Sequence, residues 1–144
     1  MTSRASWAWL GITLSTVADP PSANLPERRV EKPWGYEIWY AVTDRYAGKI
    51  LHIAAGQELS LQYHERKDET IYLLSGALEL ELDDDAGELQ TLRLSPGQCQ
   101  RIRVGRRHRM RAFEDTDVCE VSTPELDDVV RLADRYGRVV PSGG

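Results

Sequence analysis

Residues 56–76 read GQELSLQYHERKDETIYLLSG, the most informative stretch of this 144-residue chain. Gln62 and His64 are two residues apart, so on a β-strand both side chains leave the same face. Glu69 follows a short charged loop and stands at the start of the apolar run 70–74, which predicts a second strand. The stretch therefore offers an amide, an imidazole and a carboxylate from neighbouring segments.

A second stretch, residues 97–112, reads GQCQRIRVGRRHRMRA and places His108 just after a glycine-centred turn. A lone inward histidine is usually a satisfied core residue, but burying these four polar groups without a cation would cost ~1–3 kcal/mol for each unpaired one. The two stretches therefore predict a metal site. Imidazole and oxygen ligands without a thiolate favour one divalent ion of Zn, Mn, Fe, Co or Ni. The predicted ligands are Gln62, His64, Glu69 and His108.

Short β-type runs follow one another from Trp34 onward at intervals of about 8–12 residues, with turn signals between them. They span 36–42, 48–54, 58–63, 70–75, 77–82, 89–94, 99–104, 108–113 and 117–122. This cadence predicts an all-β fold, a double-stranded β-helix or jelly roll of two packed antiparallel sheets. Only residues 125–135 show helical spacing of apolar side chains, which predicts a short C-terminal helix.

The length of the chain predicts a single domain. We divide it into an N-terminal arm with a Pro-rich linker (1–30), the barrel (31–138) and a tail (139–144). Residues 6–17 alternate as a strand would, and an apolar strand on a linker can pair with its own sheet edge or with that of a second copy. A homodimer is therefore expected, although an incidental tail from a mis-chosen start codon would explain the same segment.

The net charge of −5 argues against a general nucleic-acid role, even though residues 101–111 hold six arginines and no acid. Cys99 and Cys119 form no framework of pairs and indicate reduced thiols of an intracellular protein. No apolar run reaches the ~18 residues of a membrane span. Residues 6–18 make a poor signal peptide, because polar residues dilute them and the preceding charge is thin. We therefore expect a cytoplasmic protein with neither membrane nor nucleic-acid partners.

The spacing of the two stretches resembles the two cupin motifs. The first motif is matched by Gly56-x5-Gln62-x-His64-x4-Glu69-x6-Gly76, with Gln62 in place of the usual first histidine. The second is matched by Gly97-x5-Arg103-x-Gly105-x2-His108-x3-Ala112, with Arg103 in place of a proline and Ala112 in place of an asparagine. The resemblance implies a small β-barrel with a metal site.

Within the cupins the chain is most similar to the C-terminal isomerase domain of type II mannose-6-phosphate isomerases, the bifunctional mannose-1-phosphate guanylyltransferases. The similarity covers about residues 31–138 and rests on KPWGY (32–36), QYH (62–64), DDVVR (127–131) and DRYGR (134–138). It implies a metal-dependent aldose–ketose isomerisation of mannose 6-phosphate and fructose 6-phosphate. The partner implied is a small sugar phosphate, and the four ligands also match the zinc set of the type I isomerases.

The resemblance also implies roles for three cations. Lys67 stands where the isomerase domain has an arginine that looks catalytic, and Arg109 matches the arginine after the ligand histidine, so it is expected to act in catalysis and to bind phosphate. Lys49 matches a family lysine that could reach the phosphate. Residues 65–71 depart from the family pattern, which leaves open a metal- and sugar-binding cupin without turnover, a sensor or accessory protein. An iron dioxygenase is a further alternative that the isomerase-like tail disfavours.

Overall fold

A computed structural model describes residues 23–140 of the chain. The predicted N-terminal arm strand (6–17) lies outside these residues. The described part contains eleven strands: β1 (Arg28–Lys32), β2 (Gly35–Val42), β3 (Ala47–Ile53), β4 (Leu61–Tyr63), β5 (Glu69–Ser75), β6 (Leu78–Asp83), β7 (Leu89–Leu94), β8 (Cys99–Ile102), β9 (His108–Ala112), β10 (Thr116–Ser122) and β11 (Val130–Ala133).

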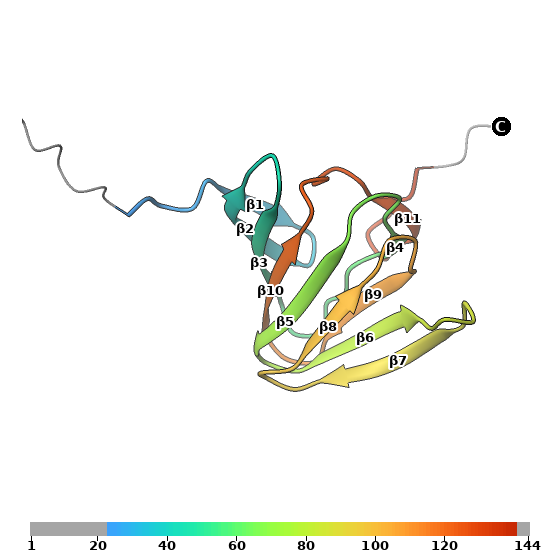
Figure 1. Ribbon diagram of the computed structural model, residues 1–144. Coiled ribbons are helices and arrows are strands. Elements are labelled where there is room, and N and C mark those ends of the chain that lie inside the picture. The colour runs from blue at the N-terminus through green and yellow to red at the C-terminus, as the bar shows by residue number, and fades with distance from the viewer. Residues whose placement is uncertain (1–22, 141–144) are drawn as a thin grey trace, which may run out of the picture.

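The strands form two antiparallel sheets that face each other, as Figure 1 shows. One sheet has six strands in the order β1-β2-β3-β10-β5-β8, and the other has five in the order β11-β4-β9-β6-β7. Neighbours in each sheet are mostly distant in sequence, as in a jelly roll. The predicted all-β fold is therefore confirmed.

The core lies between the two sheets because each strand alternates buried and outward side chains. On β6, Leu78, Leu80 and Leu82 are buried, while the residues between them face outward. On β5, Ile71 and Leu73 are buried. Each such aliphatic side chain contributes about 1.5–3 kcal/mol by leaving water, and together they fix which face of every strand turns inward.

The predicted C-terminal helix is wrong: residues 23–140 contain no helix, and the segment 125–135 instead includes β11. Val130 pairs with Tyr63 and Arg131 with Gln62, so β11 extends the five-stranded sheet at its β4 edge. The helical spacing of Val129, Val130 and Ala133 was a weak signal. An exposed strand edge with unpaired backbone groups overrode it, and the β-branched valines suit a strand. No segment within 23–140 forms an apolar helix long enough to cross a membrane.

Candidate metal centre

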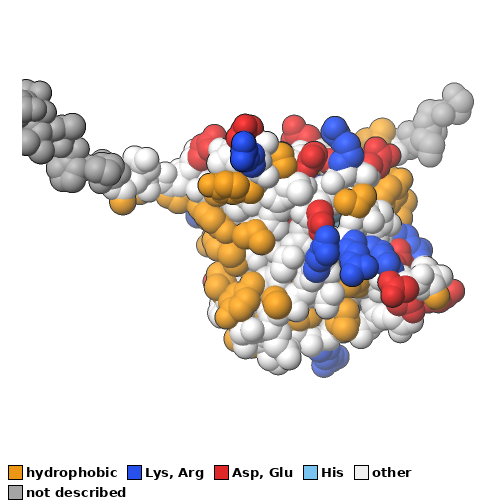
Figure 2. All heavy atoms as spheres, in the orientation of Figure 1, with side chains coloured by type: hydrophobic (Ala, Val, Ile, Leu, Met, Phe, Trp, Pro, Cys, Tyr) orange, Lys and Arg blue, Asp and Glu red, His pale blue; other side chains and the backbone are white. Residues whose placement is uncertain are grey.

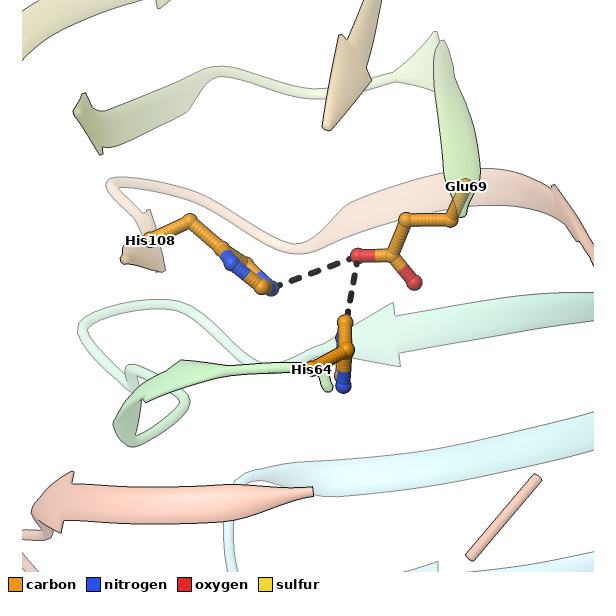
Figure 3. A group of neighbouring side chains, drawn as sticks. All are labelled: His64, Glu69 and His108. Carbon is orange, nitrogen blue, oxygen red and sulfur yellow. Dashed lines mark ion pairs between the residues drawn. The ribbon is translucent and has the colours of Figure 1, made fainter. Parts of the chain in front are cut away.

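Three side chains from three segments meet between the sheets, as Figure 3 shows. His64 follows β4, Glu69 begins β5 and His108 begins β9. All three are buried, and one ligand atom from each lies within 4.8 Å of the others. Glu69 Oε1 is 3.5 Å from His64 Nε2 and 3.3 Å from His108 Nε2. The two sequence stretches are thus brought together as predicted, in a group that could hold a metal ion.

The hydrogen bonds of the two imidazoles fix which nitrogen faces the centre. His64 Nδ1 lies 2.5 Å from the backbone oxygen of Asp128, and His108 Nδ1 lies 2.9 Å from that of Arg106. Because a carbonyl oxygen only accepts, each Nδ1 must carry the hydrogen and donate it. In neutral imidazoles the lone pairs of both Nε2 atoms then point toward Glu69.

Three acceptors therefore converge on one point. Within residues 23–140, neither Nε2 atom has a hydrogen-bond partner, and neither does Glu69 Oε1. Leaving buried acceptors unsatisfied costs several kcal/mol in total, on the order of 1–3 for each. A divalent cation would satisfy all three at once, and two imidazoles with one carboxylate suit a zinc-like ion. The residues present therefore fit a metal.

Lys67 holds the other oxygen of this carboxylate. Its Nζ is 2.6 Å from Glu69 Oε2 and 3.4 Å from Glu120 Oε2, and all three side chains are buried. Burial alone would lower the pKa of Lys67, but the charges of Glu120 and Glu69 outweigh it and the pKa is raised. Burial, with the charge of Glu69, raises the pKa of Glu120 to about 8. Lys67 thus stays charged and directs Glu69 Oε1 toward the histidines.

Gln62, the fourth predicted ligand, lies on the same inner surface. Its backbone pairs with His108 on one side and with Arg131 on the other, so the three side chains share a face. Its Oε1 accepts a hydrogen bond from Ser60 Oγ at 2.6 Å. Gln62 and His64 both line the adjoining pocket, so Gln62 faces the same space as His64.

The pocket beside the three ligands has a volume of about 290 Å³ and an excess of positive charge. Trp34, Leu51 and Leu59 supply apolar surface on its wall. The lining includes five basic side chains against three acidic ones, so the pocket favours an anionic ligand. The basic side chains are Lys32, Lys49, Lys67, Arg131 and Arg138, and the acidic ones are Glu37, Glu120 and Asp127.

Two arginines from the C-terminal segment form one part of this wall. Arg138 is held by Asp134 in a two-pronged contact, Nε to Oδ2 at 2.8 Å and Nη2 to Oδ1 at 2.9 Å. Arg131 is different, because its buried Nε has no hydrogen-bond partner within the described residues. A guanidinium that faces a pocket with an unused donor is suited to a carboxylate or phosphate.

Of the two predicted phosphate ligands, only Lys49 lies on the pocket wall. It is buried, with Nζ 3.3 Å from Glu37 Oε2. The structure does not bring Arg109 to the pocket, because neighbours on a strand face opposite ways and His108 points inward. Arg109 instead pairs with Glu81 at 2.7 Å on the far side of β9.

The arginine-rich stretch 101–111 is neutralised by acidic side chains from other strands. Arg101 pairs with Asp68, Arg106 with Asp85, Arg107 with Asp83, Arg109 with Glu81 and Arg111 with Glu58 and Glu79. Five of its six arginines are thus committed to ion pairs.

Sequence reasoning missed three residues around the centre. Asp128 accepts the backbone N–H groups of residues 65, 66 and 67 and thereby shapes the loop between the ligands. Glu120 is a charged residue in phase with the buried Val118 on β10, which is a detectable signal. Arg131 could have been found in the DDVVR motif, but the predicted helix hid its direction.

The fold and this group of side chains define the class of the protein: a double-stranded β-helix with a His–Glu–His group between its sheets. The family described as "Cupin domain" matches residues 49–123, just over half of the chain. The chain therefore belongs to the cupin family.

Relatives of known name agree with this assignment. Mannose-1-phosphate guanylyltransferase of Escherichia coli (strain K12) is 31% identical over 125 residues, which cover 85% of this chain and 26% of that protein. The xanthan biosynthesis protein XanB of Xanthomonas campestris is 31% identical over 116 residues, 77% of this chain and 24% of that protein. The chain spans about a quarter of the length of these relatives.

Solved structures agree in fold. KdgF from Halomonas sp. aligns with a TM-score of 0.57 and 28% identity, covering 67% of this chain and 85% of that chain. A mutant of Bacillus subtilis oxalate decarboxylase aligns with a TM-score of 0.66 over 78% of this chain and 33% of that chain. Its identity of 16% supports the fold alone.

Proposed function

We propose that the chain is a metal-dependent sugar-phosphate isomerase that interconverts mannose 6-phosphate and fructose 6-phosphate. The observation that carries the proposal is the junction of two features. Three buried lone pairs, from His64, Glu69 and His108, converge without a donor, and they adjoin a pocket whose lining has more basic than acidic side chains. A ligand with oxygens at one end and an anion at the other would use both.

His64, Glu69 and His108 would hold the metal, with Gln62 as a fourth ligand. When bound, a divalent ion there supplies positive charge that polarises the carbonyl and hydroxyl oxygens of a sugar. The donor set of neutral imidazoles and one carboxylate leaves a net positive charge on the site. Lys67 acts as a positioning residue, because it binds Glu69 Oε2 and leaves Oε1 for the ion.

The basic wall would hold the phosphate. Arg131 contributes an unused donor, and Arg138 is fixed in place by Asp134. Lys32 adds a further cation, its Nζ 3.9 Å from Glu37 Oε1. Anchoring the phosphate orients the other end of the sugar, which lowers the entropic barrier to reaction. The conversion moves hydrogen between C2 and C1 and needs no oxidant or second substrate.

The names of the relatives support a mannose phosphate as the ligand. The Escherichia coli relative is a mannose-1-phosphate guanylyltransferase, and the similarity of this chain to the isomerase domain of such enzymes covers the pocket wall. The motifs KPWGY, DDVVR and DRYGR supply three of its cations, Lys32, Arg131 and Arg138. These residues of the three motifs therefore lie together on the wall of one pocket.

The proposal is tested with the full chain. Metal content is measured after purification, and mannose 6-phosphate is then followed by NMR with Zn, Mn, Fe, Co or Ni added in turn. We expect one ion per chain, formation of fructose 6-phosphate, and loss of both in His108→Ala but not in His52→Ala. A chain that binds no divalent ion, or whose loaded form leaves mannose 6-phosphate unchanged, would contradict the proposal.

A second candidate is a metal- and sugar-binding cupin without turnover. The observation that favours it is that Lys67, which replaces an arginine of the isomerase domain, is fully engaged by Glu69 and Glu120. An ammonium group that is already paired with two carboxyl groups is poorly placed to contact a reacting sugar. Saturable binding of mannose 6-phosphate to the metal-loaded chain, with no conversion, would support this candidate. Oxygen uptake with Fe(II) would instead support a dioxygenase.

A further inference from the structure

The outward faces of the two sheets differ in chemistry. On the five-stranded sheet, β6 and β9 pair Glu79 with Arg111 and Glu81 with Arg109, directly opposite each other, with ion pairs of 2.8 and 2.7 Å. That face is charged, as expected for a sheet that meets water. The outward face of the six-stranded sheet can be compared with it.

The six-stranded sheet instead carries an uncharged row across five of its strands. Cross-strand pairing sets the row in register from β2 through β3, β10 and β5 to β8. We name this set the apolar row. It consists of Ile38, Ile50, Cys119, Tyr72 and Cys99. Ile50, Cys119 and Tyr72 point away from the core because both of their strand neighbours are buried, and the register places Ile38 and the exposed Cys99 on the same side.

More apolar surface flanks the apolar row. Val121 is 52% exposed on β10, Leu74 is 47% exposed on β5, and Tyr72 in the row is 44% exposed. Tyr40 is 43% exposed and its ring lies over Gly48, where any Cβ would collide with it. Figure 2 shows hydrophobic side chains gathered on the flank where β2, β3, β10 and β5 lie in Figure 1.

We propose that this outward face of the six-stranded sheet binds the same face of a second copy of the chain, giving a face-to-face dimer. The proposal is independent of the proposed function, because the metal centre and pocket lie on the opposite side of the sheet. Two antiparallel sheets pack face to face about 10 Å apart, either nearly aligned or nearly perpendicular. An apolar row of medium-sized side chains suits such packing.

Two arguments favour a second copy as the occupant. The chain carries a net charge of −5, so two copies repel unless they meet through a face where like charges are not opposed, and the apolar row is such a face. The exposed parts of Tyr40, Tyr72, Leu74 and Val121 offer on the order of 400 Å². That is about half of the ~800 Å² per partner in a standard interface, before the rest of the row is added.

The test measures the association of the full chain by sedimentation velocity between 1 and 100 µM, as an order-of-magnitude range around a micromolar Kd. We expect a dimer, and we expect Val121→Glu and Tyr72→Glu each to raise its Kd by about 100-fold, since both copies would bury an unpaired charge. Phe113→Glu is the matched control, because Phe113 is 50% exposed after β9 on the other sheet. It should leave the Kd unchanged.

Thiol labelling of Cys119 provides a second measurement that needs no variant. In a dimer formed through the apolar row, labelling of Cys119 slows as protein concentration rises. A chain that sediments as a monomer throughout overturns the proposal. Labelling of Cys119 at a rate that does not change with protein concentration would also overturn it. Equal dissociation by Phe113→Glu would place the interface elsewhere.

Discussion

His64 Nδ1 donates a hydrogen bond to the backbone oxygen of Asp128, at a distance of 2.5 Å. The same residue, through its carboxylate, accepts the amide hydrogens of Glu65, Arg66 and Lys67 at 3.1, 2.6 and 2.8 Å. One C-terminal residue therefore orients a predicted ligand and shapes the loop between the two ligands of the first motif. These hydrogen bonds also lower the pKa of Asp128 against the opposing effect of burial, so the carboxylate is charged at neutral pH.

Asp128→Ala is expected to weaken metal binding by about 10-fold, the lower end of the usual effect of losing a group that supports a ligand. The effect is at the lower end because the backbone oxygen that accepts from His64 remains and only the carboxylate that holds the loop is lost. The loop from Glu65 to Lys67 would lose three hydrogen bonds, and the position of His64 beside it would be less fixed. Calorimetric titration with Zn checks this. The neighbouring Asp127→Ala is the control, because its carboxylate makes no such contacts with the loop. Equal affinities for the two variants would refute the role of Asp128.

Metal binding is expected to stabilise the fold. At a free metal concentration 100 times the Kd, the free energy of unfolding should rise by about 2.7 kcal/mol, and a chelator should reverse the gain. His108→Ala removes one of the converging lone pairs and should abolish the increase. His52→Ala should retain it, because His52 faces outward and pairs with Asp117 at 2.7 Å. Thermal unfolding with and without metal measures both, and stabilisation of His108→Ala would contradict the assigned ligands.

Arg131→Gln should lower the affinity for mannose 6-phosphate by about 2 kcal/mol, or roughly 30-fold, the scale of one charge-assisted hydrogen bond. Affinity for unphosphorylated mannose should not change, because Arg131 is assigned only to the phosphate. Titration of the metal-loaded chain with each sugar measures the difference. Arg109→Gln is the control, since that side chain pairs with Glu81 on the far face. A comparable loss in the control would mean that the phosphate is bound elsewhere.

Lys67→Met is expected to destabilise the chain by about 3 kcal/mol, because it leaves the buried carboxylate of Glu69 without its cation. The carboxyl groups of Glu69 and Glu120 both lie within 3.4 Å of the Lys67 ammonium. All three side chains are buried, so water does not replace the lost cation. Urea unfolding at neutral pH measures the change. The adjacent Arg66→Met, at an exposed position, should alter stability by less than about 0.5 kcal/mol. An equally small effect of Lys67→Met would contradict the stabilising role assigned to the Lys67 ammonium.

The Asp134–Arg138 pair predicts a loss of stability in acid. Its hydrogen bonds with Arg138 lower the pKa of Asp134 from its ordinary 3.8 to about 2. Because the folded pKa is lower than the unfolded one, the stabilisation is complete above about pH 4 and disappears as the pH falls toward 2. Asp134→Asn should cost about 1 kcal/mol at pH 7, since solvent screens part of the pair, and only a small part of that near pH 2, where half of the carboxyl groups are protonated. Urea unfolding across this range measures the difference, and a gap at pH 2 as large as the gap at pH 7 would contradict the pKa.

Part of the metal centre could be predicted from the sequence, because its ligands lie at characteristic spacings within two short stretches. His64, Glu69 and His108 were predicted from the spacing of residues within the two stretches. The sequence did not predict that the side chain of Arg131 faces the pocket. Its strand exists only because β4 offers an unpaired edge, and β4 comes from a segment nearly seventy positions earlier in the chain.

Alternating apolar residues and turn signals were enough to predict two antiparallel sheets, because those patterns act over a few residues. The metal centre was predicted separately, from the polar residues of the two motif stretches. Only the tertiary structure decided which cations border the centre. Arg131 and Arg138 reach the pocket through contacts of β11 with β4 and through the ion pair with Asp134. Arg109 is turned away to Glu81. Strand pairing and ion pairing between distant segments depend on every strand edge and charged side chain that competes for the same partner. A local sequence pattern does not contain that information.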